Sequence, residues 1–334
     1  MKISINGYLK KKTIRVVLAV IVVLILYFLL KGNNNNNNNN NEDFINPALK
    51  YDELQGIMNN KSLDIENDLK NYVGAKLINN DTDHISLYYR NLSNGSWIGI
   101  NEDEQFSPAS LMKVPLMLAY FKKSENDPFV LDQKKLFEGN PEEKEFKQNI
   151  PPTKLLKHNK EYTVGEMIEY MIRYSDNRAS IELEKMMPLD DYKRVFIDIG
   201  SNFPDFNNGS FDNNIRVKDY AGFFRILFNS SYLNLENSQR ALKLLSQVSF
   251  DDGLKAGIPN NIKLAHKFGE RGIMGADGIE QKQLHDCGII YYPQHPYILC
   301  IMTRGYDRDQ LVSTINELSS IVYGGVDKIY GNNN

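Results

Sequence analysis

The sequence predicts an α/β (α+β) fold: a five-stranded antiparallel sheet, covered by terminal helices, with an inserted all-helical subdomain. Short segments of alternating polarity occur towards both ends of the chain, and amphipathic helical segments lie between them. Hairpin-type loops join the alternating segments, so the strands pair antiparallel and helices are needed to cover the sheet. A cleft is expected where the sheet and the helical subdomain meet.

Five segments are predicted to be strands on their alternation and their flanking turn residues. They are 84–90, 96–100, 263–269, 284–292 and 297–303. The loop Asn91-Leu92-Ser93-Asn94-Gly95 is typical of a hairpin, and Pro293-Gln294-His295-Pro296 joins the last two strands. If the last hairpin is centred on that loop, the only two cysteines, Cys287 and Cys300, lie diagonally, a poor geometry for a disulfide. Two buried free thiols are therefore predicted.

Helices are predicted where apolar residues recur three and four positions apart. They cover about 52–73, 110–123, 219–228, 238–247 and 309–322. Thr163 and Glu166 form a capping-box pattern that starts another helix. That helix ends at Ser175-Asp176-Asn177, and a further helix continues from there through Met187.

The first forty residues differ in composition from the rest. Four basic residues between positions 10 and 15 precede an unbroken apolar run, Val16–Leu30, and no small-x-small cleavage site follows it. We expect an uncleaved signal anchor within 1–31, in preference to a cleaved signal peptide. The excess of Lys and Arg before the run places the N-terminus in the cytoplasm and the body outside the cell membrane.

Nine asparagines, Asn33–Asn41, predict a flexible linker over 32–50. The remaining 51–330 is expected to form one folded domain. Its sheet part is expected at 51–109 and 250–330, and its helical part at 110–249.

The composition and the missing motifs argue against several function classes. A formal net charge of -3 gives no field strong enough to indicate a nucleic-acid partner. Walker, Rossmann, HExxH and CxxC patterns do not occur in the sequence, so no cofactor is expected. His266, His285 and Asp286 lack metal-ligand spacing and are interpreted as strand side chains near the cleft, so no metal is expected.

Ser110-Leu111-Met112-Lys113 carries the candidate nucleophile. A serine hydroxyl attacks only when a neighbouring base takes its proton. Lys113 lies one helical turn from Ser110, and burial beside another cation would lower its pKa enough for that task. A serine at a helix N-terminus also lies near free backbone N–H groups, which can stabilise an oxyanion.

Two further segments supply polar groups. Ser175-Asp176-Asn177 has the residue types preferred at helix N-caps, and it also offers a hydroxyl and an amide for proton relay and substrate binding. Lys267 lies on a predicted strand, where lysines are usually solvated. Gly269 would let a substrate backbone approach the edge of that strand closely.

Together the three segments, in this order, resemble the S-x-x-K, S-D-N and K-T-G motifs of the penicillin-recognising serine enzymes, and most closely the class A-type serine β-lactamases. The resemblance spans about 51–329, with the strand His285-Asp286-Cys287-Gly288-Ile289-Ile290 included. It implies a β-lactamase/transpeptidase-like fold and a catalytic domain over 51–330.

The resemblance also implies a role for each site residue. Ser110 would attack a β-lactam or D-Ala-D-Ala-like carbonyl, Lys113 would be its base, and Ser175 would pass a proton to the leaving nitrogen. The substrate would be bound by Asn177, Lys267, Gly269 and Glu270. The backbone N–H groups of Ser110 and Glu270 would form the oxyanion hole.

Two departures from the family pattern affect the expected chemistry. Phe268 replaces the small hydroxyl residue that follows the lysine of the third motif. No glutamate occurs from Lys185 to Leu235, where class A enzymes carry the glutamate that activates the deacylating water. The shortened loop 201–214 offers only Asp205 and Asp212, so acylation with slow deacylation is expected.

Three functions remain open on the sequence alone. The first is a β-lactamase-type serine hydrolase. The second is a D,D-carboxypeptidase-like enzyme acting on peptidoglycan stem peptides, which the missing glutamate and the anchor favour. The third is a non-catalytic cell-wall-binding domain, which Phe268 favours and the other motif residues disfavour.

Overall fold

The computed structural model describes residues 44–46, 65–79, 82–139, 148–204, 215–275 and 278–331, all within one compact unit that begins at Phe44. The predicted anchor, the asparagine run and most of the helix predicted at 52–73 lie outside the described residues. Within the described ranges, no helix is both long and apolar enough to cross a membrane.

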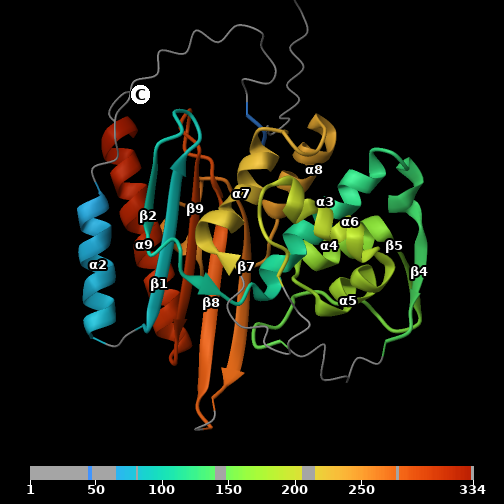
Figure 1. Cartoon of the computed structure of the whole chain (residues 1–334), viewed down its shortest axis with the longest axis horizontal. Helices are drawn as coiled ribbons and strands as arrows, with labels where there is room; N and C mark the ends of the chain where they lie inside the picture. Colours follow the sequence, from blue (N-terminus) through green and yellow to red (C-terminus); the bar gives the residue numbers. More distant parts are fainter. Residues whose placement is uncertain are drawn as a thin grey trace, which may run out of the picture. The chain divides into compact units, whose positions relative to one another are not determined.

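A five-stranded antiparallel sheet forms the centre of this unit, in the order β2-β1-β9-β8-β7 (Figure 1). The strands are β1 (His84–Asn91), β2 (Trp97–Ile100), β7 (Leu264–Met274), β8 (Glu280–Ile290) and β9 (Tyr297–Gly305). All five correspond to predicted strands, and the predicted fold class is confirmed. β7 and β8 form a longer hairpin than predicted, because their pairing continues to Met274 and Glu280.

The register of β8 and β9 corrects the prediction of two free thiols. Cys287 pairs directly with Cys300, and the two form a buried disulfide. The predicted register was wrong because β8 ends at Ile290, which pairs with Tyr297. The His295 N–H donates to the carbonyl oxygen of Tyr292, so Tyr291 and Tyr292 belong to the connecting loop, which starts two residues earlier than expected.

Two cores lie on opposite faces of the sheet, because successive side chains of a strand point to opposite sides. Helices α2 (Glu66–Ile78) and α9 (Arg308–Tyr330) cover one face, at the left of Figure 1. The helical part covers the other face. Its helices are α3 (Lys113–Ser124), α4 (Val164–Arg173), α5 (Asn177–Met186), α6 (Leu189–Asp198), α7 (Val217–Phe228) and α8 (Leu235–Leu245).

Most predicted helices are present, with two differences. α6 was not predicted, and α9 continues eight residues beyond its predicted end. The predicted capping box is confirmed: the Thr163 hydroxyl accepts from the Glu166 N–H, and the Glu166 carboxylate accepts from the Thr163 N–H. That box fixes the start of α4, which ends beside Ser175.

Two small two-stranded sheets link the parts of the chain. β3 (Gln105–Phe106) pairs with β6 (Ile215–Arg216), just before the Ser110 turn. β4 (Lys134–Phe137) pairs with β5 (Lys160–Thr163), in a charged stretch whose sequence gave no periodic signal.

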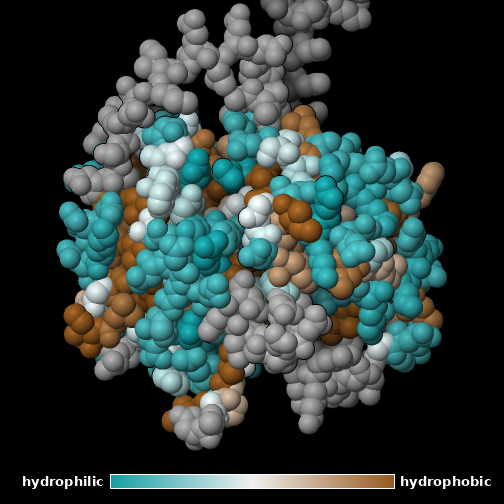
Figure 2. Space-filling model, viewed as in Figure 1, coloured by the Kyte–Doolittle hydropathy of each residue, from teal (hydrophilic) through white to brown (hydrophobic). Residues whose placement is uncertain are grey.

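Residues 44–46, predicted to belong to the linker, pack against the folded unit. Phe44 is only 2% exposed, and its ring meets that of Tyr291 edge to face. Its N–H donates to the side chain of Gln239. The folded unit therefore starts before position 51. On the surface shown in Figure 2, hydrophilic residues predominate and hydrophobic ones lie among them.

Candidate active site

Ser110 lies in a short 3-10 helix, η2 (Ala109–Met112), that leads directly into α3. The sequence predicted that an α-helix begins at Ser110. In the structure the α-helix begins at Lys113, and Ser110 lies one turn before it. Ala109, immediately before it, has φ of 47°, a conformation that non-glycine residues rarely adopt. Backbone strain of this kind clusters at functional sites, because only a well-packed surrounding can hold it.

Lys113, the first residue of α3, is 4% exposed. Its ammonium donates to the Ser175 carbonyl oxygen at 2.7 Å, the Ser175 hydroxyl at 3.2 Å and Asn177 Oδ1 at 2.7 Å. Burial lowers the pKa of Lys113 to about 7, although Asp176, Glu184 and Glu270 oppose the shift. A substantial fraction of the side chain is therefore a neutral amine near neutral pH, as a general base requires.

The turn between α4 and α5 holds Ser175 inside the site. Ser175 is buried and has φ of 56°, the second non-glycine residue of the site with a left-handed backbone. Asp176 caps α5, as its residue type predicts: Oδ1 accepts from the Arg178 N–H at 2.9 Å, and Oδ2 from the Leu156 N–H at 2.7 Å. The capping interpretation and the site interpretation therefore both apply to this segment.

Lys267 is fully buried, unlike most lysines on strands. Its ammonium donates to the Ser175 hydroxyl at 2.9 Å and to the Phe268 carbonyl oxygen at 2.8 Å. Burial and the nearby Lys113 lower its pKa well below the ordinary value for lysine. The Ser175 hydroxyl thus accepts from both lysines, which leaves its own proton available for donation.

Phe268 does not simply add bulk to the cleft. Its ring is 3% exposed, belongs to the core under α9 and stacks on Phe250 with the ring centroids 4.2 Å apart. The Lys267 ammonium lies 4.0 Å from the centroid of the same ring. The aromatic face therefore stabilises the buried ammonium of Lys267.

Gly269 brings strand β7 against the turn that carries Ser110. A Cβ atom at Gly269 would lie 3.0 Å from Leu111 Cγ and 3.2 Å from the Pro108 carbonyl oxygen. The absence of a side chain at Gly269 thus lets η2 lie close to β7. It sets the backbone of Glu270, the next residue, beside the nucleophile turn.

Residues 148–150 also contribute, although no pattern in the sequence indicates them. Gln148 Nε2 donates to the Ser175 carbonyl oxygen at 2.9 Å, and Gln148 Oε1 accepts from the Asn177 N–H at 3.1 Å. The Glu270 carboxylate accepts from the N–H groups of Asn149 and Ile150. Burial raises the pKa of Glu270. A glutamine in an irregular segment has no periodicity or spacing that would mark it.

The structure thus brings Lys113 and Lys267 to the Ser175 hydroxyl and Asn177 to Lys113, with Ser110 one turn from Lys113. Asp205 and Asp212, the only carboxylates of the shortened loop, lie outside the described residues.

The two histidines have separate environments. His266 Nδ1 lies 2.8 Å from Asp286 Oδ1, on the α9 side of the sheet. His285 faces the other way, and its Nε2 donates to the Ser107 carbonyl oxygen at 3.0 Å. Burial lowers the pKa of His285 to about 4, so the ring is neutral. Among the described residues, no cluster of three or more His, Cys, Asp or Glu could hold a metal ion.

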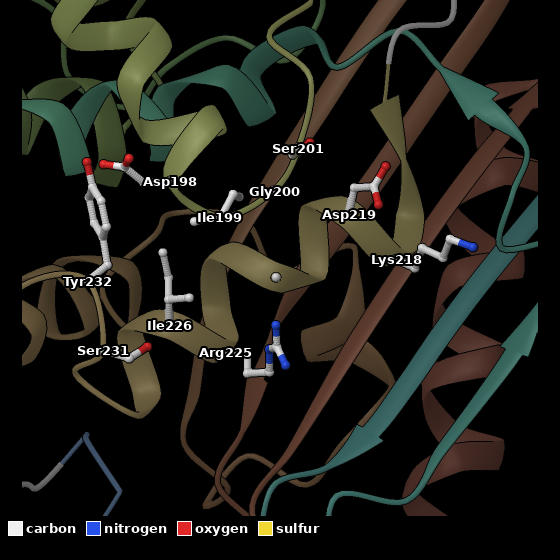
Figure 3. Close-up of a pocket in the computed structure, with 11 residues that line it drawn as sticks. Asp198, Ile199, Gly200, Ser201, Lys218, Asp219, Arg225, Ile226, Ser231 and Tyr232 are labelled. Atoms are coloured by element: carbon white, nitrogen blue, oxygen red, sulfur yellow. The ribbon is translucent and has the colours of Figure 1, made fainter.

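A separate pocket of about 310 Å³ lies between the end of α6, the outer face of α7 and the loop after α7 (Figure 3). Lys218 and Asp219 on its rim are engaged in ion pairs with Asp103 and Arg216. Its described lining contains none of the residues predicted for catalysis or substrate binding.

The comparison with known proteins decides the family. Residues 65–326 match the family described as the beta-lactamase enzyme family, which is well over half of the chain. This chain belongs to the beta-lactamase enzyme family. No curated protein matches the chain in sequence.

Solved structures share the fold of this family member. A mutant of PBP-A, in an acyl-enzyme complex with penicillin G, is 22% identical with a TM-score of 0.65, over 78% of this chain and 97% of that one. A beta-lactamase from Sphaerobacter thermophilus is 19% identical with a TM-score of 0.66, over 80% and 99%. A class A beta-lactamase representative from Bacteroides cellulosilyticus is 16% identical with a TM-score of 0.66, over 80% and 100%. The resemblance stated from the motifs is confirmed.

Proposed function

We propose that the protein is a serine hydrolase that opens β-lactam amides through an acyl-enzyme on Ser110 and releases the acyl group slowly. One observation carries this proposal: Lys113, one turn from Ser110, is buried with a pKa of about 7 and is held by Ser175 and Asn177. A base with a pKa near the working pH is the most effective proton acceptor for a serine hydroxyl.

Each residue has a step in this mechanism. Lys113 takes the Ser110 proton as Oγ attacks the lactam carbonyl, and the N–H groups of Ser110 and Glu270 stabilise the oxyanion. The Ser175 hydroxyl, which accepts from both lysines, gives its proton to the leaving nitrogen. Asn177 binds the amide of the substrate side chain, and the charge of Lys267 attracts the substrate carboxylate.

Slow deacylation follows from the missing loop glutamate. The stretch from Lys185 to Leu235 offers no glutamate to activate a water molecule against the acyl-enzyme. A fold neighbour, the PBP-A mutant, is described as an acyl-enzyme complex with penicillin G. The missing glutamate also favours a second candidate, a D,D-carboxypeptidase-like enzyme acting on peptidoglycan stem peptides. Its acyl-enzyme would form from a peptide substrate instead of a β-lactam.

We further propose that the catalytic unit lies outside the cytoplasm, tethered by the apolar run Val16–Leu30. The buried disulfide between Cys287 and Cys300 supports this location, because structural disulfides persist mainly in oxidising compartments. A protease-accessibility assay on intact cells would test it: digestion of the catalytic unit from outside is expected, and full protection would contradict the proposal.

The test of the activity uses the full chain in detergent, incubated with a fluorescent penicillin and followed by intact mass beside Ser110→Ala. Persistent label on the wild type alone is the expected result. Label that disappears within seconds as product forms would disprove slow deacylation. No label, with turnover of a D-Ala-D-Ala peptide, would favour the second candidate. No reaction with either substrate would favour a non-catalytic binding domain.

A further inference from the structure

Three consecutive residues connect two sides of the active site, here called its first and second walls. Gln148 binds the first wall, the Ser175–Asn177 turn, through both atoms of its side-chain amide. The N–H groups of the next two residues bind the second wall, through the carboxylate of Glu270 on β7. We call residues 148–150 the strap.

Hydrogen bonds of two different kinds hold the two ends of the strap, and we say that they latch it. At the Ser175 end, the bonds are neutral amide contacts of 2.9 and 3.1 Å. At the β7 end, one carboxylate accepts from two backbone N–H groups, and such charge-assisted bonds are the stronger kind. Ile150 also packs against the core under α9. Removal of the Glu270 carboxylate should therefore release the strap from β7 while leaving its Gln148 end in place.

The strap bridges the two residues between which a substrate's side-chain arm would leave the site. In the proposed mechanism, the Asn177 side chain binds the side-chain amide of a β-lactam and the Glu270 N–H receives the oxyanion. The strap bonds the same two residues through other atoms, the Asn177 N–H and the Glu270 carboxylate. A closed strap and a large acyl arm therefore compete for one space, whereas the β-lactam nucleus beside Ser110 does not compete with the strap.

We propose that the strap, latched by Glu270, selects acyl donors with a small or absent side-chain arm. The inference rests on the proposed function and specifies its substrate class. Glu270 acts here through the strap, as a residue that determines specificity, separately from the role of its backbone N–H.

The test compares penicillin G with 6-aminopenicillanic acid, which has the same nucleus without the phenylacetyl arm. The acylation rate of the full chain is measured with both, by intact mass, for wild type, Glu270→Ala and Glu280→Ala. Glu280 is the control: it lies on the partner strand of the same hairpin, opposite Met274, and its carboxylate faces Lys282 at 3.8 Å. Hydrogen exchange of the Asn149 and Ile150 amides is measured in parallel.

We expect wild type to favour 6-aminopenicillanic acid. Glu270→Ala should raise the ratio of the penicillin G rate to the 6-aminopenicillanic acid rate by roughly tenfold or more, because each charge-assisted hydrogen bond lost corresponds to about a factor of ten. The two amides should exchange faster in Glu270→Ala and unchanged in Glu280→Ala. A purely structural role would lower both rates together and leave their ratio constant, which would overturn the proposal.

The outcomes separate this inference from the proposed function. If both penicillins label wild type equally and Glu270→Ala leaves their ratio unchanged, the strap proposal is wrong and the proposed function stands. If neither penicillin labels Ser110, the proposed function fails, and the selectivity inference, which rests on it, fails as well. In that case the exchange data still decide whether Glu270 latches the strap.

Discussion

The Tyr220 hydroxyl donates to the carbonyl oxygen of Leu111 at 3.0 Å, from α7 to the turn that carries Ser110. The residue four positions after Leu111 is Pro115, which has no N–H to supply the usual helical bond. The phenol takes the place of that missing donor. Tyr192, on α6, donates in the same way to the Met112 carbonyl oxygen at 2.9 Å. The helical part thus holds the nucleophile turn through two buried phenols.

Tyr220→Phe is expected to slow acylation of Ser110 and to lower the free energy of unfolding by about 1 kcal/mol, because the Leu111 carbonyl loses its hydroxyl donor and keeps only the N–H of Lys113, two residues further on. Tyr192→Phe is the matched control, since the Met112 carbonyl, as N-cap of α3, also has a helical partner. Penicillin acylation rates and urea denaturation would measure both effects. Equal losses in the two variants would contradict the role given to Pro115.

The pH dependence of acylation should report the titration of Lys113. The amine must be neutral to accept the Ser110 proton, and its pKa is about 7. The acylation rate is therefore expected to rise with pH, with a midpoint near that value, and then to level off. Lys113→Arg should lower the rate roughly 10²- to 10⁴-fold, because a guanidinium remains protonated. A pH-independent rate in the wild type would exclude Lys113 as the base.

Phe268→Thr, which restores the hydroxyl of the family motif, should destabilise the protein by about 3 kcal/mol. The substitution removes a buried ring that stacks on Phe250 and faces the Lys267 ammonium. Phe129→Thr is the control, because that ring is 75% exposed and its loss should cost less than about 0.5 kcal/mol. Thermal denaturation compares the two, and similar changes in Tm would show that Phe268 has no structural role.

The disulfide predicts both the thiol reactivity of the chain and a contribution to its free energy of unfolding. The denatured, unreduced chain should contain no thiol that reacts with a maleimide. Replacement of both Cys287 and Cys300 by alanine should lower the free energy of unfolding by about 3 kcal/mol, the value for a closed loop of this size. Two reactive thiols in the unreduced chain would restore the original prediction from the sequence.

Much of the fold could be predicted because it rests on local signals. The Thr163 and Glu166 capping box fixed the start of α4, and the loop Asn91–Gly95 connects β1 and β2 as its residues indicate. The end of β8 could not be predicted in this way. The pairing of β8 with β9 stops at Ile290 and Tyr297, and this register is set by how the strands pack together, which no local pattern records.

The candidate site also has features that local sequence predicts and features that depend on the tertiary structure. By itself, the sequence determined which residues are expected to carry the chemistry, since Ser110 and Lys113 are one turn apart on any helix and each of the three motifs is a short continuous stretch of the chain. Only the tertiary structure decided the burial, the hydrogen-bond partners and therefore the pKa values of these residues. It buries Lys113 and Lys267 around the Ser175 hydroxyl, supplies Tyr220 where Pro115 lacks an N–H, and brings Gln148 across to Asn177. A pKa depends on the burial and charges around a group, and these come from segments far apart in sequence, which meet only when the chain is folded.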